Sequence, residues 1–347
     1  MNERRIHIYS EKQCDQTFLI HGYLETQVDD TVINEIINNP ISEVIQISDY
    51  ISESTLRKLN EVFIKRPDIQ FRVYDRIGCW PEFHGWNLQF LSLLPAVEKL
   101  CIDNFECLDT DFSVLQSLSG LKELQLYIFN VKDYSFVNNL PVQIESLTID
   151  AEMMSGRAKF DCRWLMRFPL LHTLFLGKID KNLECIVALD RLRNLTLRGV
   201  RVKDLSFLKQ LQIESLTISW SSVNKTDWDS LRSFSTIHHL KLFSIKKMDD
   251  ISFVATLPHL EKLELIWMGA VVRLPDLSCL ENLKEVYIDT ANKLEDISGL
   301  VGARNLREVR ISNSKSITTD AANVLMKNPS IEKFLCYGAK TGIKIGY

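Results

Sequence analysis

The chain has 347 residues, of which 46% are apolar and 25% are charged, a composition typical of a globular protein. Its formal net charge of −4 argues against a general nucleic-acid binder and against attraction to an anionic membrane. No apolar run approaches the roughly 20 residues of a membrane-spanning helix, and the first ten residues lack the apolar core of a secretion signal. We therefore expect a cytoplasmic protein that binds neither nucleic acid nor membrane.

Residues 1–94 read as an N-terminal cap built from degenerate helix–strand units. Polar residues alternate with Ile6 and Ile8 and again with Phe18 and Ile20, which predicts a short hairpin. A separate small functional domain is the alternative to a cap. The other elements expected here are helices at 30–39 (capped by Asp30) and 52–66, strands at 45–47 and 71–73, and a junction plug of Trp80, Phe83, Trp86 and Phe90.

From residue 95 onward one spacing of apolar residues recurs, with apolar side chains at a first position and at +3 and +5 from it. The heptapeptide QIESLTI, present at 143–149 and again at 212–218, is one instance. The ten intervals have a mean of 23.4 residues, and a fixed period of this size indicates stacked repeats. The eleven copies begin at Val97, Leu121, Ile144, Leu171, Leu192, Ile213, Ile237, Leu260, Leu283, Leu306 and Ile331.

Each copy predicts a short strand with one apolar side. In residues 260–265, Leu260, Leu263 and Leu265 are apolar, and the last two share one face of a strand while +2, +4 and +6 point the other way. Stacked edge to edge, such strands give a parallel sheet with its apolar side inside the coil.

The segment that returns to each strand is also repetitive. It reads Asp-x-Ser followed by apolar residues at 111–115, 133–137, 204–208, 250–254, 276–280 and 296–300. Asp and Ser can cap a helical turn by accepting backbone N–H bonds. Most gaps have room only for a short helix or 3₁₀ turn, whereas residues 161–168 and 318–327 read as longer amphipathic segments.

These strand motifs and the Asp-x-Ser-x-Leu return resemble the leucine-rich repeat superfamily, and the return looks most like the short repeats of bacterial internalin-type proteins. The resemblance covers residues 95–338 as an array of about eleven repeats, with 339–347 as a closing segment. It implies an α/β solenoid: a leucine-rich repeat horseshoe with a parallel concave sheet and short helices, 3₁₀ turns or loops on the convex side. The Asn ladder that many relatives place at +8 is missing, because no copy has Asn there. The turns after the strands must satisfy their backbone groups by other means.

We find no catalytic residues, no metal site and no cofactor motif. Cys79 and His84 lie five residues apart in an aromatic-rich linker, with nothing to indicate an orienting third group. Cys14 with His21 is no better. The eight cysteines include no Cys-x-x-Cys pair, so reduced thiols are the simplest interpretation.

The outward face of the strands carries the candidate binding site. Positions +2, +4, +6 and +7 of a solvated sheet should be mostly polar, yet aromatic residues recur there, with Ile128 and Ile266 beside them. Cross-strand stacking that only stabilises the sheet is the alternative. Cations in the middle copies, among them Lys178, suggest a basic strip, and a solvated surface of mixed charge is the alternative. The partner-binding candidates are Tyr127, Phe175, Arg198, Trp220, Lys241, Phe243, Lys262, Trp267 and Tyr287.

The sequence thus predicts a non-enzymatic protein–protein interaction module, monomeric when free, whose concave face holds a protein with an acidic patch. A bacterial immunity or inhibitor protein that occludes a toxin is one concrete version. An adaptor or a host-directed effector scaffold fits the same residues. The competing class is an enzyme with a minimal catalytic region in residues 1–94.

Overall fold

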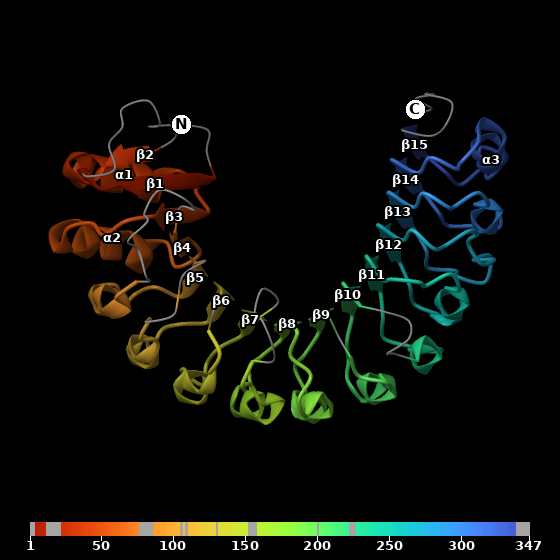
Figure 1. The fold of residues 1–347 in the computed structure, drawn as a ribbon. Helices are drawn as coiled ribbons and strands as arrows, with labels where there is room; N and C mark the ends of the chain where they lie inside the picture. Colours follow the sequence, from red (N-terminus) through yellow and green to blue (C-terminus); the bar gives the residue numbers. More distant parts are fainter. Residues whose placement is uncertain are drawn as a thin grey trace. The chain divides into compact units, whose positions relative to one another are not determined.

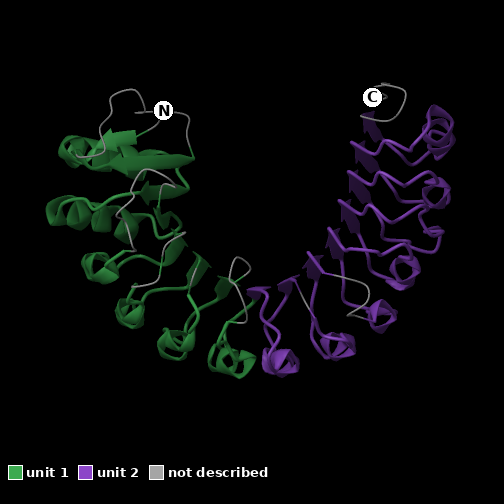
Figure 2. Ribbon diagram, viewed as in Figure 1, with its two compact units in different colours: residues 1–172 green, residues 173–347 purple. Residues whose placement is uncertain are grey.

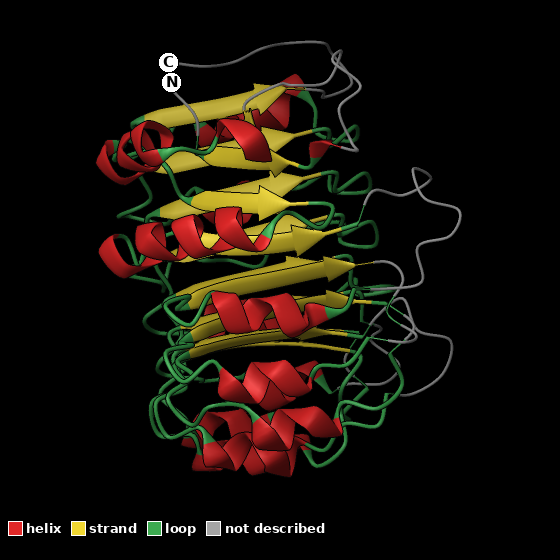
Figure 3. Cartoon of the chain, turned by 90° about the vertical axis from the view of Figure 1, so that its left-hand side faces the viewer, coloured by secondary structure: helices red, strands yellow, loops and turns green. Residues whose placement is uncertain are grey.

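The computed structural model describes residues 4–11, 22–75, 86–104, 107, 110–129, 131–151, 158–199, 201–221 and 227–337. The chain divides into two compact units, residues 1–172 and residues 173–347 (Figure 2). Within each unit the strands lie on the inner side of a curve and the short helices on its outer side (Figure 1). The strands within a unit all point the same way (Figure 3).

In unit 1 the described strands follow the order β2-β1-β3-β4-β5-β6-β7 and pair in parallel. Its strands are β1 (Arg5–Tyr9), β2 (Gly22–Leu24), β3 (Val44–Ile47), β4 (Gln70–Tyr74), β5 (Lys99–Asn104), β6 (Glu123–Ile128) and β7 (Ser146–Asp150). Its helices are α1 (Asp30–Asn38) and α2 (Glu53–Lys65), with 3₁₀ helices η3 (Glu25–Gln27), η4 (Leu88–Leu93), η5 (Ser113–Ser117), η6 (Ser135–Asn139) and η7 (Cys162–Arg167).

The helices and strands expected between residues 30 and 73 are present, with one correction. The cap of α1 is Asp29 rather than Asp30, because the Asp29 carboxylate accepts the N–H of Val32 at 3.0 Å. The hairpin stays a prediction, because Phe18 and Ile20 lie outside the described residues; β1 itself pairs in parallel with β2 and β3. Of the junction plug, Trp86 is fully buried against Tyr50, with ring centroids 4.8 Å apart, while Trp80 and Phe83 are not described.

Unit 2 contains β8 to β15 in sequence order, again pairing in parallel. Its strands are β8 (Thr173–Gly177), β9 (Asn194–Arg198), β10 (Ser215–Ser219), β11 (His239–Phe243), β12 (Lys262–Ile266), β13 (Glu285–Asp289), β14 (Glu308–Ser312) and β15 (Lys333–Tyr337). Its helices are η8 (Leu183–Ala188), η9 (Ser206–Gln210), η11 (Trp228–Leu231), η12 (Ser252–Thr256), η13 (Ser298–Leu300) and α3 (Thr319–Leu325). The predicted α/β solenoid of parallel strands and short outer helices is therefore confirmed.

The repeated apolar spacing forms the core. Residues at the first position, +3 and +5 are buried in every copy, with Leu124, Leu216 and Leu263 all at 0% exposure. The exception is Ile331, which is half-buried. One side of every strand is thus removed from water, which is the main force that stabilises stacked repeats.

The Asp-x-Ser returns are capped as the sequence predicts. In all six the Asp carboxylate accepts the backbone N–H of the residue two positions later, at 2.7–2.9 Å. The hydrogen bond from Lys159, together with that from the Ser135 N–H, holds the pKa of Asp133 below its usual value. Hydrogen bonds from the side chain and the backbone N–H of Ser298 likewise lower the pKa of Asp296. The predicted longer segments before Leu171 and Ile331 are η7 and α3.

A backbone ladder replaces the missing Asn ladder. In seven successive copies of unit 2 the +7 residue has a positive φ, between 51° and 66°. Its N–H donates to the +6 carbonyl of the next strand, at 2.7–3.0 Å. The left-handed conformation therefore ends each strand and still satisfies its backbone. The seven residues are Lys178, Gly199, Trp220, Ser244, Trp267, Thr290 and Asn313.

Candidate partner-binding face

Trp220, Phe243 and Trp267, here called the aromatic cluster, lie together at the ends of β10, β11 and β12. Their ring centroids are 5.5 Å apart for Trp220–Phe243, 5.3 Å for Phe243–Trp267 and 5.9 Å for Trp220–Trp267. All three pairs meet edge to face, a favoured geometry for aromatic rings. Parallel pairing in register brings about this proximity, which the sequence predicted from consecutive repeats.

The two tryptophans are held in a costly conformation and still leave much of their surface in water. Trp220 has φ 52° and Trp267 has φ 54°, a left-handed region that costs a bulky residue on the order of 1–2 kcal/mol. They are 39% and 48% exposed. Gly199 and Ser244 occupy the equivalent turn in the neighbouring copies, so the turn itself needs no large side chain. Large exposed aromatic side chains at a strained turn that does not need them point to a role beyond folding.

The face beside the aromatic cluster is positively charged over β8 to β11. The guanidinium of Arg198 lies 5.7 Å from the centroid of the Trp220 ring, within cation–π range. The +2, +4, +6 and +7 positions of these four strands carry the cations of Lys178, Arg198 and Lys241, and no carboxylate. The remaining positions are mainly small hydroxyl and amide side chains. This part of the face is electrostatically suited to an acidic surface.

The basic strip does not extend unchanged into β12. Glu264 forms ion pairs with both Lys241, at 3.1 Å, and Lys262, at 3.3 Å. The hydrogen bond from His239, together with Lys241, lowers the pKa of Glu264 to about 2. Lys262 also lies 3.4 Å from Glu285. The two lysines are therefore largely neutralised. Glu264 occupies a +4 position, so the signal was present in the repeat spacing and was overlooked.

The other candidates are spread more widely. The register aligns Phe175 with Thr196, Thr217 and Lys241, so Phe175 is three strands, or about 14 Å, from Lys241. Tyr287 lies on β13, where its register partner on β12 is Glu264. Tyr127 belongs to β6 in unit 1.

The prediction that Ile128 lies on the solvent-facing side of its strand is wrong. Ile128, at +7, is fully buried, whereas Ile266 at +6 is half-buried beside Phe243. Ile128 itself has no positive φ, and the Phe129 N–H donates back to the Asn104 carbonyl at 3.0 Å. The position of the turn thus decides which way a +7 side chain points.

The structure adds little to the catalytic alternatives. Cys14, His21, Cys79 and His84 lie outside the described residues. Burial raises the pKa of the Cys101 thiol to about 12, which disfavours the thiolate needed for nucleophilic attack. Within the described ranges, no three His, Cys, Asp or Glu side chains group closely enough to hold a metal ion. Nor does any helix in this part of the chain have the length and apolar character to cross a membrane.

Comparison with solved structures identifies the architecture. An internalin of Listeria monocytogenes superimposes with a TM-score of 0.52 and 18% sequence identity, over 88% of this chain and 87% of its own. A leucine-rich repeat protein of Leptospira interrogans gives a TM-score of 0.50 and 12% identity, over 90% of this chain and 82% of its own. The chain has the leucine-rich repeat fold. No protein-family model matches this leucine-rich repeat chain, and no curated protein sequence is detectably similar to it.

Proposed function

We propose that this leucine-rich repeat protein is a non-enzymatic binding module whose unit 2 holds a folded protein against the inner face of β8 to β15. The aromatic cluster is the centre of the proposed contact. Its two tryptophans are the observation that carries the proposal, since each occupies a strained turn and remains substantially exposed. Large, rigid aromatic side chains with these properties are typical anchors of protein interfaces.

The alternative explanation, that the rings only brace the sheet, fits less well. Edge-to-face aromatic pairs contribute roughly 0.5–1.5 kcal/mol each. The left-handed backbone of Trp220 and Trp267 offsets much of that gain. A turn with Gly keeps the same backbone ladder without the strain, as Gly199 does. The tryptophans therefore have little net value to the fold.

The proposed partner presents an acidic patch. The cations of Lys178 and Arg198 favour such a patch, and Arg198 beside Trp220 combines charge with aromatic contact area. Charge complementarity of this kind raises association rates and excludes wrong partners. A cytoplasmic bacterial immunity or inhibitor protein that occludes a toxin is the most specific form of the proposal. An adaptor or host-directed effector scaffold would use the same face.

The proposal is tested by identifying the partner and measuring its affinity. Co-purification from the source organism with the wild-type chain supplies a candidate, which is then produced alone for calorimetric titration. The double variant Trp220→Ser and Trp267→Ser should bind at least about 30-fold more weakly, as expected for loss of hot-spot residues. Val142→Ser with Met166→Ser, which removes two exposed apolar side chains of unit 1, is the matched control and should retain full affinity. Full affinity in the tryptophan variant contradicts the proposal.

A further inference from the structure

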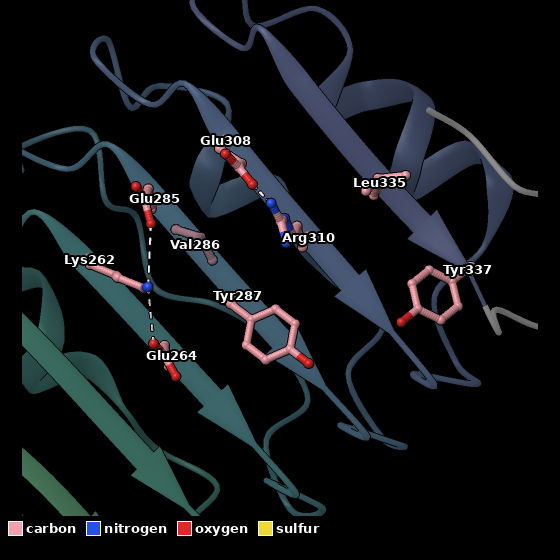
Figure 4. Close-up of a pocket in the computed structure, with 9 residues that line it drawn as sticks. All are labelled: Lys262, Glu264, Glu285, Val286, Tyr287, Glu308, Arg310, Leu335 and Tyr337. Carbon is pink, nitrogen blue, oxygen red and sulfur yellow. Dashed lines mark hydrogen bonds and ion pairs between the residues drawn. The ribbon is translucent and has the colours of Figure 1, made fainter. Parts of the chain in front are cut away.

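The inner face of unit 2 has a hollow of about 530 Å³ over β12 to β15 (Figure 4). Arg310 lies on the central strand of this region, β14, and its register partners are Tyr287 on β13 and Leu335 on β15. Tyr337 closes the far side and is 48% exposed. The hollow therefore combines one guanidinium and two phenols with the apolar side chains of Val286 and Leu335, and Lys262 and three glutamates also line it.

The carboxylates around the hollow already have cationic partners. Glu264 is paired with Lys241 and Lys262, as described above. Glu285 lies 3.4 Å from Lys262, and Glu308 lies 3.6 Å from Lys333 and accepts a hydrogen bond from Arg310 Nε. A cation entering the hollow would have to compete with these partners. Asp289, two residues beyond Tyr287, does not line the hollow, and its carboxylate accepts from neutral side chains, including Asn313 at 2.9 Å.

Several hydrogen-bond donors of the hollow, in contrast, have no partner among the described residues. Arg310 engages Glu308 only through Nε, and within the described part of the chain its two terminal nitrogens donate no hydrogen bond. The side chain of Arg310 is 55% exposed. The hydroxyls of Tyr287 and Tyr337 likewise have no hydrogen-bond partner among the described residues. Four guanidinium N–H groups and two phenols of the hollow thus donate to no acceptor among the described residues.

We propose that this hollow binds the carboxylate of an Asp or Glu side chain that the protein partner inserts. A carboxylate accepts two parallel N–H bonds from a guanidinium, which matches the terminal nitrogens of Arg310. The phenol of Tyr337 or Tyr287 supplies a further donor, and Leu335 contacts the aliphatic part of the inserted side chain. The inference rests on the proposed function, because it assumes a partner on this face, and it names a second contact for the acidic patch.

The test uses the whole chain and small probes, so that it needs no partner. Arginine side chains are labelled with ¹⁵N, and Arg310→Gln assigns the Arg310 Nε–H resonance. Acetyl-glutamate amide, whose only carboxylate is the side chain, should shift this resonance saturably. Acetyl-glutamine amide, which has the same shape without the charge, should bind at least about tenfold more weakly. Tyr337→Phe should weaken the response, whereas Arg232→Gln on the outer side, where Arg232 pairs with Asp229 at 2.9 Å, should leave it unchanged.

Three results would overturn the inference: equal binding of the glutamine probe, tighter binding of acetyl-lysine amide, or an Arg310 resonance that no probe moves. Glu308 keeps Lys333 as a partner in Arg310→Gln, so this variant should fold, and its melting curve checks that. A glutamate response together with full partner affinity of the tryptophan variants would reject the proposed function and leave the carboxylate site standing. No glutamate response, together with weakened partner binding by the tryptophan variants, would reject the carboxylate site and leave the proposed function standing.

Discussion

At the residue scale, the left-handed turn gives a direct test of strain at the aromatic cluster. Trp267→Ala and Trp267→Gly remove the same ring, but Ala keeps a Cβ at φ 54° and Gly does not. We expect Trp267→Gly to be the more stable of the two by about 1 kcal/mol, the reverse of the usual order. Urea denaturation of both variants measures the difference.

The matched control for this pair is Thr217, on the inner face of β10, where φ is not positive. There Thr217→Ala should be more stable than Thr217→Gly by about 0.5–1 kcal/mol, because Gly loses more conformational freedom on folding. If Trp267→Ala is instead as stable as Trp267→Gly, the tryptophan turn is not strained. The inference from strain to binding would then lose its basis.

Glu264 gives a pH-dependent prediction. Its pKa of about 2 in the folded chain lies below its ordinary value of 4.5, so it stabilises the fold above pH 4.5 and this contribution is lost as pH falls toward 2. Its side chain is 12% exposed and holds Lys241 and Lys262. At pH 7, Glu264→Gln should lower the free energy of unfolding by about 1–3 kcal/mol. The difference in free energy of unfolding between parent and variant should be smaller at pH 3 than at pH 7. A difference that does not change with pH would contradict the account.

At the element scale, the stability of the repeats depends on the buried side chains of their strands. Leu216 on β10 is fully buried between β9 and β11, so Leu216→Ala should cost about 2–5 kcal/mol through lost burial and a cavity. Thr217→Ala, the next residue on the opposite face, should cost less than about 1 kcal/mol. Thermal melting compares the two, and a Leu216→Ala variant that melts like the parent would refute the assignment of the core.

The Asp-x-Ser returns make a second prediction about elements. Asp296 accepts the N–H of Ser298 at 2.9 Å, and hydrogen bonds from Ser298 lower the pKa of Asp296. Asp296→Ala should destabilise the chain at pH 7 by about 1 kcal/mol, whereas Asp296→Asn, which keeps an acceptor, should cost little. Because the folded pKa is lowered, the Asp296 contribution is present at neutral pH and lost as pH falls below its usual value near 3.8. Equal stability of the Ala and Asn variants would show that the cap is unimportant.

The elements were the most predictable part of the molecule, because their signals are local. Apolar spacing fixes which side of a strand is buried, and an Asp before a turn can cap it within two residues. The parallel pairing of β1 with β2 was missed, since alternation in two nearby segments says nothing about strand direction. The left-handed turns were missed as well, because Trp at such a position is contrary to its intrinsic preference.

At the scale of the whole molecule, repetition fixes the fold but not the function. The sequence predicted the proximity of Trp220, Phe243 and Trp267, because consecutive repeats place equivalent residues side by side. It did not predict that Glu264 would neutralise Lys241 and Lys262, because ion pairing depends on register and side-chain reach across three strands. The boundaries at residues 94 and 338 and the monomeric state stay predictions.

The central claim is that a protein partner lies against the inner face of unit 2, and photo-crosslinking tests it most directly. Thr217 faces inward on β10, and Lys209 lies exposed on η9 of the outer side just before that strand. Thr217→p-benzoylphenylalanine should crosslink to the bound partner on irradiation, whereas Lys209→p-benzoylphenylalanine should not. Crosslinking from Lys209 with none from Thr217, in variants that melt like the parent and retain affinity, would contradict the account.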